Sequence, residues 1–340
     1  MVIRWKLKKL VVGLLGLYAL NIRKSPTNFF PPTLSIKLTD RCNYHCITCN
    51  HYQMGDKRSE LTLQQWQYVL RDFKEMGGFS VRFTGGEPLL RKDIDSLVSY
   101  AKSLGLRVSI ATNGSLLTEE QVGLFRKESV GRVTISMHGK EETHDSIVGI
   151  KGSWKKLDSI IKHMRRIELP VGIAFTIIKR NIGEIEAIVK YAKDLDIAVE
   201  FNIFHNNLYF SQGIDSSIGP SVEEMRGATN LLIELKRKYP EHIAGSIKGF
   251  REIPALLQDS RLPHYYCART LMGLFIDSLG NVYPGCWAMS PAGRLNNNTL
   301  FDIFRSQDYI EKRVKGFNKE CPGCTCGYEM DVLMNIRRRA

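Results

Sequence analysis

The sequence predicts an α/β protein built around a parallel β-sheet. Six apolar, strand-like runs alternate with helical stretches between residues 34 and 240, and parallel neighbours need such crossover connections. The runs are rich in β-branched residues, as in strands covered on both faces. These observations leave two architectures open, an open doubly wound sheet and a full or partial barrel. In either one, ligands gather at the carboxyl ends of the strands.

The predicted elements follow in order along the chain. The strands are residues 34–39, 81–86, 108–114, 133–139, 172–178 and 199–204. After the first strand, apolar residues at helical spacing predict a helix with one buried face, made by Leu63, Trp66, Val69, Leu70, Phe73 and Met76. Helix-starting capping boxes are predicted at Thr62 with Gln65, at Thr118 with Gln121 and at Ser221 with Glu224.

The chain has 340 residues, enough for one large core or for a large and a small domain. Its eight cysteines fall into two groups, Cys42, Cys46 and Cys49, and then Cys267, Cys286, Cys321, Cys324 and Cys326. A secreted disulfide framework would be denser and more evenly spread, whereas close clusters are typical of metal ligation. We therefore expect a cytoplasmic protein with reduced thiols.

The net charge of +13 is concentrated at the chain ends. Residues 1–39 carry seven Lys or Arg and no acid, and residues 337–339 are all Arg. A nucleic-acid groove would interleave basic and aromatic residues along the body, so no nucleic-acid partner is expected. The apolar run over residues 10–20 is too short to span a bilayer of about 30 Å. The amphipathic pattern of residues 1–25 fits peripheral contact with the inner face of the membrane, and equally a helix docked on the protein itself.

The first cysteine group lies on one short loop, "LTDRCNYHCITCNHY", with the spacing C-x3-C-x2-C. Three thiolates can hold a [4Fe–4S] cluster and leave one iron without a protein ligand, open to the amine and carboxylate of an amino acid. Zinc also binds clustered cysteines, so the spacing alone leaves zinc open. The motifs "TGGEP", "ATNG" and "SMHG" end the next three strands and share this rim.

The triplet and the "GGEP" motif together resemble the radical S-adenosylmethionine (radical SAM) superfamily. The "ATNG" motif and residues 144–154 and 180–192 extend the resemblance over roughly residues 34–330. It implies a partial (β/α)6 TIM-like barrel and a [4Fe–4S] cluster on Cys42, Cys46 and Cys49, with SAM on the fourth iron. It also implies cofactor contacts from Gly85, Gly86, Glu87, Asn113 and Ser136. Thr48 and His138 depart from the usual aromatic and acidic residues, and His138 is not assigned a catalytic role.

The second cysteine group resembles the Twitch and SPASM auxiliary cluster domains. Residues 265–287 predict a hairpin in which "LFID" and "NVYP" flank a turn. The resemblance implies a second, auxiliary [4Fe–4S] cluster on Cys267, Cys286, Cys321 and Cys324, with Cys326 replacing one of them or free. A structural zinc site is the alternative. The expected organisation is a basic amphipathic arm (1–33), a radical SAM core (34–240), a connecting segment (241–266) and an auxiliary cluster domain (267–340).

The resemblance implies an enzyme that reductively cleaves SAM to a 5′-deoxyadenosyl radical, which abstracts hydrogen from a substrate. The auxiliary cluster is expected to accept an electron, giving a net oxidation, and flavodoxin or ferredoxin is the expected electron donor. One alternative is a maturase that modifies a side chain of a ribosomal peptide or protein. Another, from a different class, is a zinc-stapled nucleic-acid-binding protein without radical chemistry. The sequence does not decide among a small molecule, a lipid or glycan, and a peptide as substrate.

Overall fold

The protein, seen here in a computed structural model, is described over residues 30–54, 59–206, 210–259, 266–295 and 298–321. Six parallel strands form its centre, and each overlaps the strand predicted for it. They are β1 (Thr33–Lys37), β2 (Ser80–Thr84), β3 (Arg107–Thr112), β4 (Arg132–Ser136), β5 (Val171–Ile177) and β6 (Ala198–Ile203). Each strand pairs in parallel with the next.

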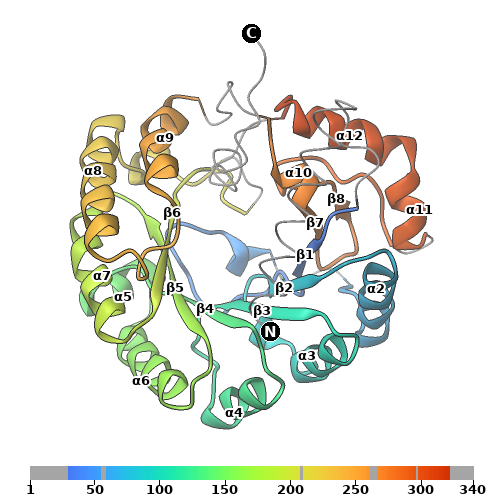
Figure 1. The fold of residues 1–340 in the computed structure, drawn as a ribbon, viewed down its shortest axis with the longest axis horizontal. Helices are drawn as coiled ribbons and strands as arrows, with labels where there is room; N and C mark the ends of the chain where they lie inside the picture. Colours follow the sequence, from blue (N-terminus) through green and yellow to red (C-terminus); the bar gives the residue numbers. More distant parts are fainter. Residues whose placement is uncertain (1–29, 55–58, 207–209, 260–265, 296–297, 322–340) are drawn as a thin grey trace.

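Helices surround the outside of this sheet (Figure 1). They are α2 (Leu63–Glu75), α3 (Ile94–Ser103), α4 (Glu119–Lys127), α5 (Glu141–Val148), α6 (Ser153–Arg166), α7 (Ile185–Asp194), α8 (Val222–Lys238) and α9 (Ile247–Gln258). The strand order β6-β5-β4-β3-β2-β1 follows the chain without a reversal, whereas a doubly wound sheet reverses its order at a switch point. The predicted partial barrel is confirmed, and the doubly wound alternative is excluded.

The two faces of the strands differ in chemistry. Outward residues such as Ile36, Phe83 and Ile110 are fully buried and pack with helix residues such as Trp66 and Phe73. The alternate, inward residues are polar or small and line a cavity: Ser35, Lys37, Arg82, Thr84, Ala111, Ser136, Ala174, Thr176, Glu200 and Asn202. The period of two turns every second side chain into the barrel, so helices cover the outer face and the inner face lines the cavity.

The predicted helix starts are mostly confirmed. Thr62 and Ser221 each close a full capping box, with Gln65 and Glu224 as the reciprocal residues. At Thr118 only half of the box forms: its side chain accepts a hydrogen bond from the backbone N–H at the third helical position. The side-chain amide at that position instead donates to Asp95 on α3 at 2.9 Å, so it ties two helices together.

The predicted C-terminal hairpin is present. Strand β7 (Gly273–Ile276) pairs antiparallel with β8 (Val282–Tyr283), and β7 also pairs in parallel with β1. The hairpin thus extends the barrel sheet beyond its first strand, which the sequence did not predict. Helices α10 (Arg269–Met272), α11 (Leu300–Arg305) and α12 (Gln307–Phe317) lie around it (Figure 1).

Residues 1–29, which hold the predicted amphipathic helix, lie outside the described residues. Among the residues that the structure describes, every helix is too short or too polar to cross a bilayer.

Candidate active site

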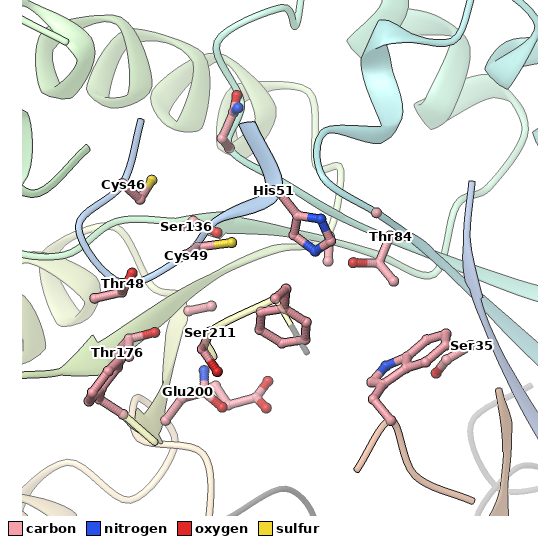
Figure 2. A pocket seen from close by; sticks show the side chains of 18 of the residues that line it. Ser35, Cys46, Thr48, Cys49, His51, Thr84, Ser136, Thr176, Glu200 and Ser211 are labelled. Atoms are coloured by element: carbon pink, nitrogen blue, oxygen red, sulfur yellow. The ribbon is translucent and has the colours of Figure 1, made fainter. Parts of the chain in front are cut away.

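A cavity of 640 Å³ opens at the carboxyl ends of the barrel strands. Its wall contains residues from each of β1 to β6, from the cysteine loop after β1, and from the segment around Cys286 after β8. Figure 2 shows Cys46 and Cys49 on one side of this space, across from Glu200 and Ser211. The cavity therefore joins the two cysteine-bearing regions that the sequence analysis singled out.

The structure brings Cys42, Cys46 and Cys49 together on the cavity wall as free, half-buried thiols. Burial raises the pKa of each thiol, that of Cys49 to about 11. Nearby Cys42 and Cys49 raise the pKa of Cys46 further by charge repulsion. Three buried thiolates at this place need a cationic partner, and an iron–sulfur core supplies one. Among the described residues, no group of three His, Cys, Asp or Glu side chains is placed to bind a single metal ion. The argument for a cluster therefore depends on the three thiols of this loop.

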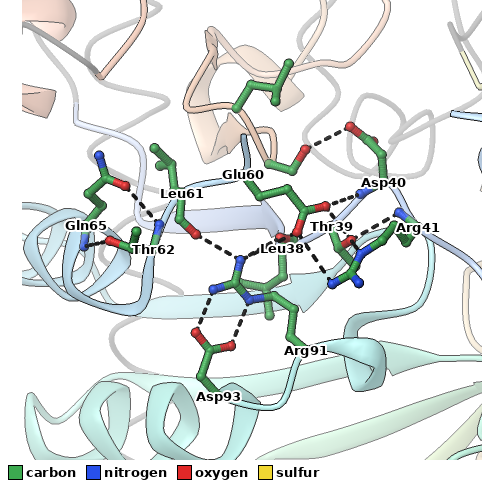
Figure 3. Close-up of polar contacts among 12 residues, drawn as sticks. Leu38, Thr39, Asp40, Arg41, Glu60, Leu61, Thr62, Gln65, Arg91 and Asp93 are labelled. Atoms are coloured by element: carbon green, nitrogen blue, oxygen red, sulfur yellow. Dashed lines mark hydrogen bonds and ion pairs between the residues drawn. The ribbon is translucent and has the colours of Figure 1, made fainter. Parts of the chain in front are cut away.

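The start of the cysteine loop is held by buried and half-buried charged groups (Figure 3). Glu60 accepts a hydrogen bond from the Thr39 hydroxyl group, and Arg91 donates to the Leu38 carbonyl oxygen at 3.3 Å. Asp93 binds the Arg91 guanidinium through two bonds of 2.6 and 2.8 Å. Such a bidentate pair fixes orientation as well as distance. The loop thus leaves β1 from a rigid base.

The middle of the loop is tied to the neighbouring strand end. Asn113, which follows β3, donates to the side-chain oxygen of Asn43 at 2.9 Å, and Asn43 donates to the Ser115 hydroxyl at 2.8 Å. The Tyr44 hydroxyl lies 2.6 Å from that of Ser153 at the start of α6. Asn113 lines the cavity, as a cofactor contact should, and its side chain also holds the cysteine loop in place.

Gly85 and Gly86 are required by close packing against the same loop. A Cβ atom at Gly85 would lie 2.6 Å from the Thr39 carbonyl oxygen, and one at Gly86 would overlap the Arg41 carbonyl oxygen. The Gly86 N–H donates to Thr39 at 2.7 Å and the Glu87 N–H to Arg41 at 2.8 Å. The two glycines therefore seat the cysteine loop as well as lining the cavity.

Glu87 lies under the rim and is fully buried. Its carboxylate accepts hydrogen bonds from the Thr112 hydroxyl at 2.6 Å and from the backbone N–H groups of Asn113 and Leu89 at 2.7 and 3.0 Å. Burial raises the pKa of Glu87 to about 7, and these hydrogen bonds oppose the shift. Glu87 is not among the described residues that line the cavity. In this arrangement it fixes the end of β3 and, through it, Asn113.

Ser136 and His138 close the rim at the end of β4, and both line the cavity. His138 Nδ1 accepts a hydrogen bond from the Thr176 N–H at 3.2 Å, which assigns the ring proton to Nε2. Burial lowers the pKa of His138 to about 3, so the ring is neutral at physiological pH. His138 is thus a hydrogen-bonded, neutral residue of the rim.

Lys37, at the end of β1, is a cavity residue that the sequence analysis missed. Its side chain is 3% exposed, and its Nζ atom lies 3.3 Å from Asp40 Oδ1. The ammonium group also lies 5.1 Å and 5.5 Å from the ring centres of Phe210 and Trp287. Burial lowers the pKa of Lys37 to about 8, and Asp40 opposes that shift. The sequence pattern that could have indicated this is strand alternation, because Lys37 lies two residues after Ser35 and so on the same face of β1.

The second cysteine group is described only in part, because Cys324 and Cys326 lie outside the described residues. Cys286 is 6% exposed and lines the cavity. The Cys267 N–H donates at 2.9 Å to the carbonyl oxygen of residue 317, the last residue of α12 and four positions before Cys321. This bond places Cys267 beside the segment that leads to Cys321.

Gly285, directly before Cys286, packs closely against the segment that follows Cys267. Gly285 has a φ of 100°, a region that favours glycine. A Cβ atom there would lie 2.5 Å from the Cα atom of Thr270 on α10, three residues after Cys267. Close packing at Gly285 therefore joins the flanks of Cys267 and Cys286.

Comparison with known proteins agrees with this architecture. Residues 36–192 match the model of the radical SAM superfamily. The AdoMet-dependent heme synthase of Methanosarcina barkeri (strain Fusaro / DSM 804) is 34% identical over 322 residues, which cover 86% of this chain and 91% of that protein. The Fe-coproporphyrin III synthase of the same organism is 31% identical over 228 residues, 64% of this chain, and the chain spans about half of it, 53%.

The fold also recurs in a solved structure. SuiB of Streptococcus suis, bound to its precursor peptide SuiA, superimposes with a TM-score of 0.72 at 17% identity, covering 89% of this chain and 74% of that one. The family match and the near full-length relative decide against a zinc-stapled nucleic-acid-binding protein without radical chemistry. The chain belongs to the radical SAM superfamily, and it is a radical SAM enzyme.

Proposed function

We propose that Cys42, Cys46 and Cys49 bind a [4Fe–4S] cluster with one open iron, and that the enzyme abstracts hydrogen from a substrate held in the 640 Å³ cavity. The observation that carries this proposal is that the three thiols and Cys286 open into the same cavity. When bound, the cluster supplies the electron that splits SAM into methionine and a 5′-deoxyadenosyl radical. The chain's own residues hold the cysteine loop, position both ligands and exclude water.

We further propose that Gly85, Gly86, Asn113 and Ser136 contact SAM. All four lie at the ends of neighbouring strands and line the cavity beside the cysteine loop. Glu87 contributes indirectly, because its carboxylate already accepts three hydrogen bonds within the protein. Its part is to hold the end of β3 so that Asn113 faces the cofactor.

The second cysteine group is proposed to hold an auxiliary [4Fe–4S] cluster within residues 267–340. Cys267, Cys286, Cys321 and Cys324 are the proposed ligands, and Cys326 is the substitute for one of them. The cavity reaches Cys286, which supports electron transfer from a substrate radical to this cluster and hence a net oxidation. Flavodoxin or ferredoxin is the proposed donor to the first cluster. Zinc in equal amount to protein, with iron only at the first site, would contradict the auxiliary cluster.

Two substrate classes follow from the relatives. Two of them are named for heme and Fe-coproporphyrin III synthesis, and SuiB was solved with a precursor peptide. The cavity wall carries the cations Lys37, Arg82 and Arg269, and Glu200 is its one acid among the described lining residues. A surplus of cations suits a substrate with carboxylates. We therefore propose a carboxylate-bearing tetrapyrrole as the first candidate and a peptide as the second.

The proposed function is tested by anaerobic reconstitution with iron and sulfide, followed by dithionite and SAM. We expect 5′-deoxyadenosine from the wild-type enzyme and none above background from Cys46→Ala. A fully iron-loaded wild-type sample that forms no 5′-deoxyadenosine would contradict the proposal. Adding Fe-coproporphyrin III separates the substrate candidates: a new porphyrin product by mass spectrometry supports the first, and an unchanged porphyrin beside active SAM cleavage directs the search to peptides.

A further inference from the structure

A buried ion pair lies between the cysteine loop and the C-terminal hairpin. Lys37 Nζ and Asp40 Oδ1 are 3.3 Å apart, and their side chains are 3% and 15% exposed. The Ser278 hydroxyl, in the turn between β7 and β8, donates to Asp40 Oδ2 at 2.8 Å. On the other side, His51 Nδ1 lies 3.7 Å from Asp40 Oδ1. The pair is therefore fixed in place from two separate parts of the chain.

The ion pair lies beside the cysteine loop. Lys37 and Cys49 line the same cavity, and Asp40 contacts the ring of His51, two residues after Cys49. The backbone N–H of His51 hydrogen-bonds the Cys49 sulfur. The positive charge of Lys37 lowers the pKa of that thiol, and burial raises it by more. His51 itself is neutral at physiological pH, because burial lowers its pKa to about 3. The ammonium of Lys37 is thus the cation that acts on Cys49, and the carboxylate of Asp40 is its ion-pair partner.

We propose that the Lys37–Asp40 pair sets the reduction potential of the cluster on Cys42, Cys46 and Cys49, with Lys37 raising it and Asp40 lowering it. This inference rests on the proposed function, since it requires a cluster at that place. An added electron makes the cluster more negative, so a nearby cation stabilises the reduced state and a nearby anion destabilises it. Burial strengthens both effects, because the surroundings screen them less than water does.

Holding the cysteine loop in place does not by itself explain why the Lys37–Asp40 pair is buried there. The loop is already held by Glu60, Arg91, Asn113 and the two glycines of the "TGGEP" motif. Burying a lysine and an aspartate is costly, and apolar residues of similar size often serve stability as well or better. A buried cation beside an electron-transfer centre has an effect that an apolar side chain does not reproduce.

The test is an anaerobic redox titration of the fully reconstituted, full-length enzyme, followed by electron paramagnetic resonance. The signal that changes when SAM is added identifies the first cluster. We expect Lys37→Met to shift its midpoint potential to more negative values and Asp40→Asn to shift it to more positive values. The double variant returns toward wild type. At the wild-type midpoint, a tenfold fall in the ratio of reduced to oxidised cluster corresponds to a shift of 59 mV.

Two controls separate charge from structure. Lys37→Arg keeps the charge and is expected to keep the potential. Lys236→Met removes a part-buried lysine from α8, which lies outside the cavity wall, and is expected to leave the potential unchanged. Equal potentials in iron-loaded Asp40→Asn, Lys37→Met and wild type would overturn the inference while the proposed function stands. If Lys37→Met fails to bind iron, the sign of the Asp40→Asn shift decides. A wild-type protein without a SAM-sensitive cluster would overturn the proposed function itself.

Discussion

Replacing Gly86 with alanine tests how the barrel seats the cysteine loop. The added Cβ atom would lie 2.8 Å from the Asp40 carbonyl oxygen, 0.6 Å inside the 3.4 Å at which ordinary contact begins, and 2.7 Å from the Arg41 carbonyl carbon. All of its close neighbours are backbone atoms, so no side chain can turn aside to relieve the overlap. The loop that carries Cys42 must move instead.

The expected cost of such overpacking is about 1–3 kcal/mol. If that cost falls on the SAM-competent position of the loop, SAM binding weakens by roughly 5- to 150-fold, since 1.4 kcal/mol is a factor of ten. The assay is equilibrium binding of SAM to the reconstituted protein, with iron content measured on the same samples. Gly123→Ala is the matched control, because a Cβ atom in that helix meets no atom within 4 Å. Equal SAM affinity and iron content in Gly86→Ala and wild type would refute the packing argument.

Three further predictions concern other parts of the molecule. Burial raises the pKa of Glu87 in the folded protein to about 7, from its usual 4.5. The folded state therefore holds the carboxyl proton more tightly than the unfolded state does, and Glu87 stabilises the fold below pH 4.5. This stabilisation, up to about 3 kcal/mol, is lost as the pH rises to 7. In urea unfolding of the apo-protein, the free energy of unfolding of Glu87→Gln should therefore rise relative to that of wild type between pH 5 and pH 8. A difference between the two proteins that does not change with pH would contradict this. Ser221→Ala removes the capping box of α8 and should lower the free energy of unfolding by about 1 kcal/mol, whereas an unchanged urea midpoint would show that the cap adds nothing. Cys286→Ser should halve the iron content, remove substrate oxidation and retain SAM cleavage; full iron content would exclude Cys286 as a ligand.

Much of the fold was predictable because its signals are local. All six strands and the C-terminal hairpin follow from short apolar runs and turn residues. The strand pattern alone left the barrel open, and the family resemblance supplied it, although the alternation of Arg82 and Thr84 with Val81 and Phe83 already indicated a polar interior. The pairing of β7 with β1 joins residues about 240 positions apart. Nothing in either local sequence specifies that contact.

The positions of the motif residues in the fold were predictable, and their contacts with one another were less so. The cysteine triplet and the glycines of "TGGEP" stand where the motifs placed them. That Gly86 packs against the cysteine loop depends on how two loops approach each other, and so does the burial of Glu87 beneath the rim. Lys37 was counted with the basic N-terminal residues, because a lone lysine in a strand is usually solvated. Only the direction of its side chain shows that it faces the cavity.

The central claim is that the three-cysteine loop leaves one iron open for SAM. It is tested most directly by electron–nuclear double resonance on the reduced, reconstituted enzyme with SAM labelled with nitrogen-15 in its amino group. We expect a hyperfine coupling between the cluster and that nitrogen, because the amine binds the open iron. A fully loaded, reduced cluster that shows no such coupling with SAM bound would contradict it.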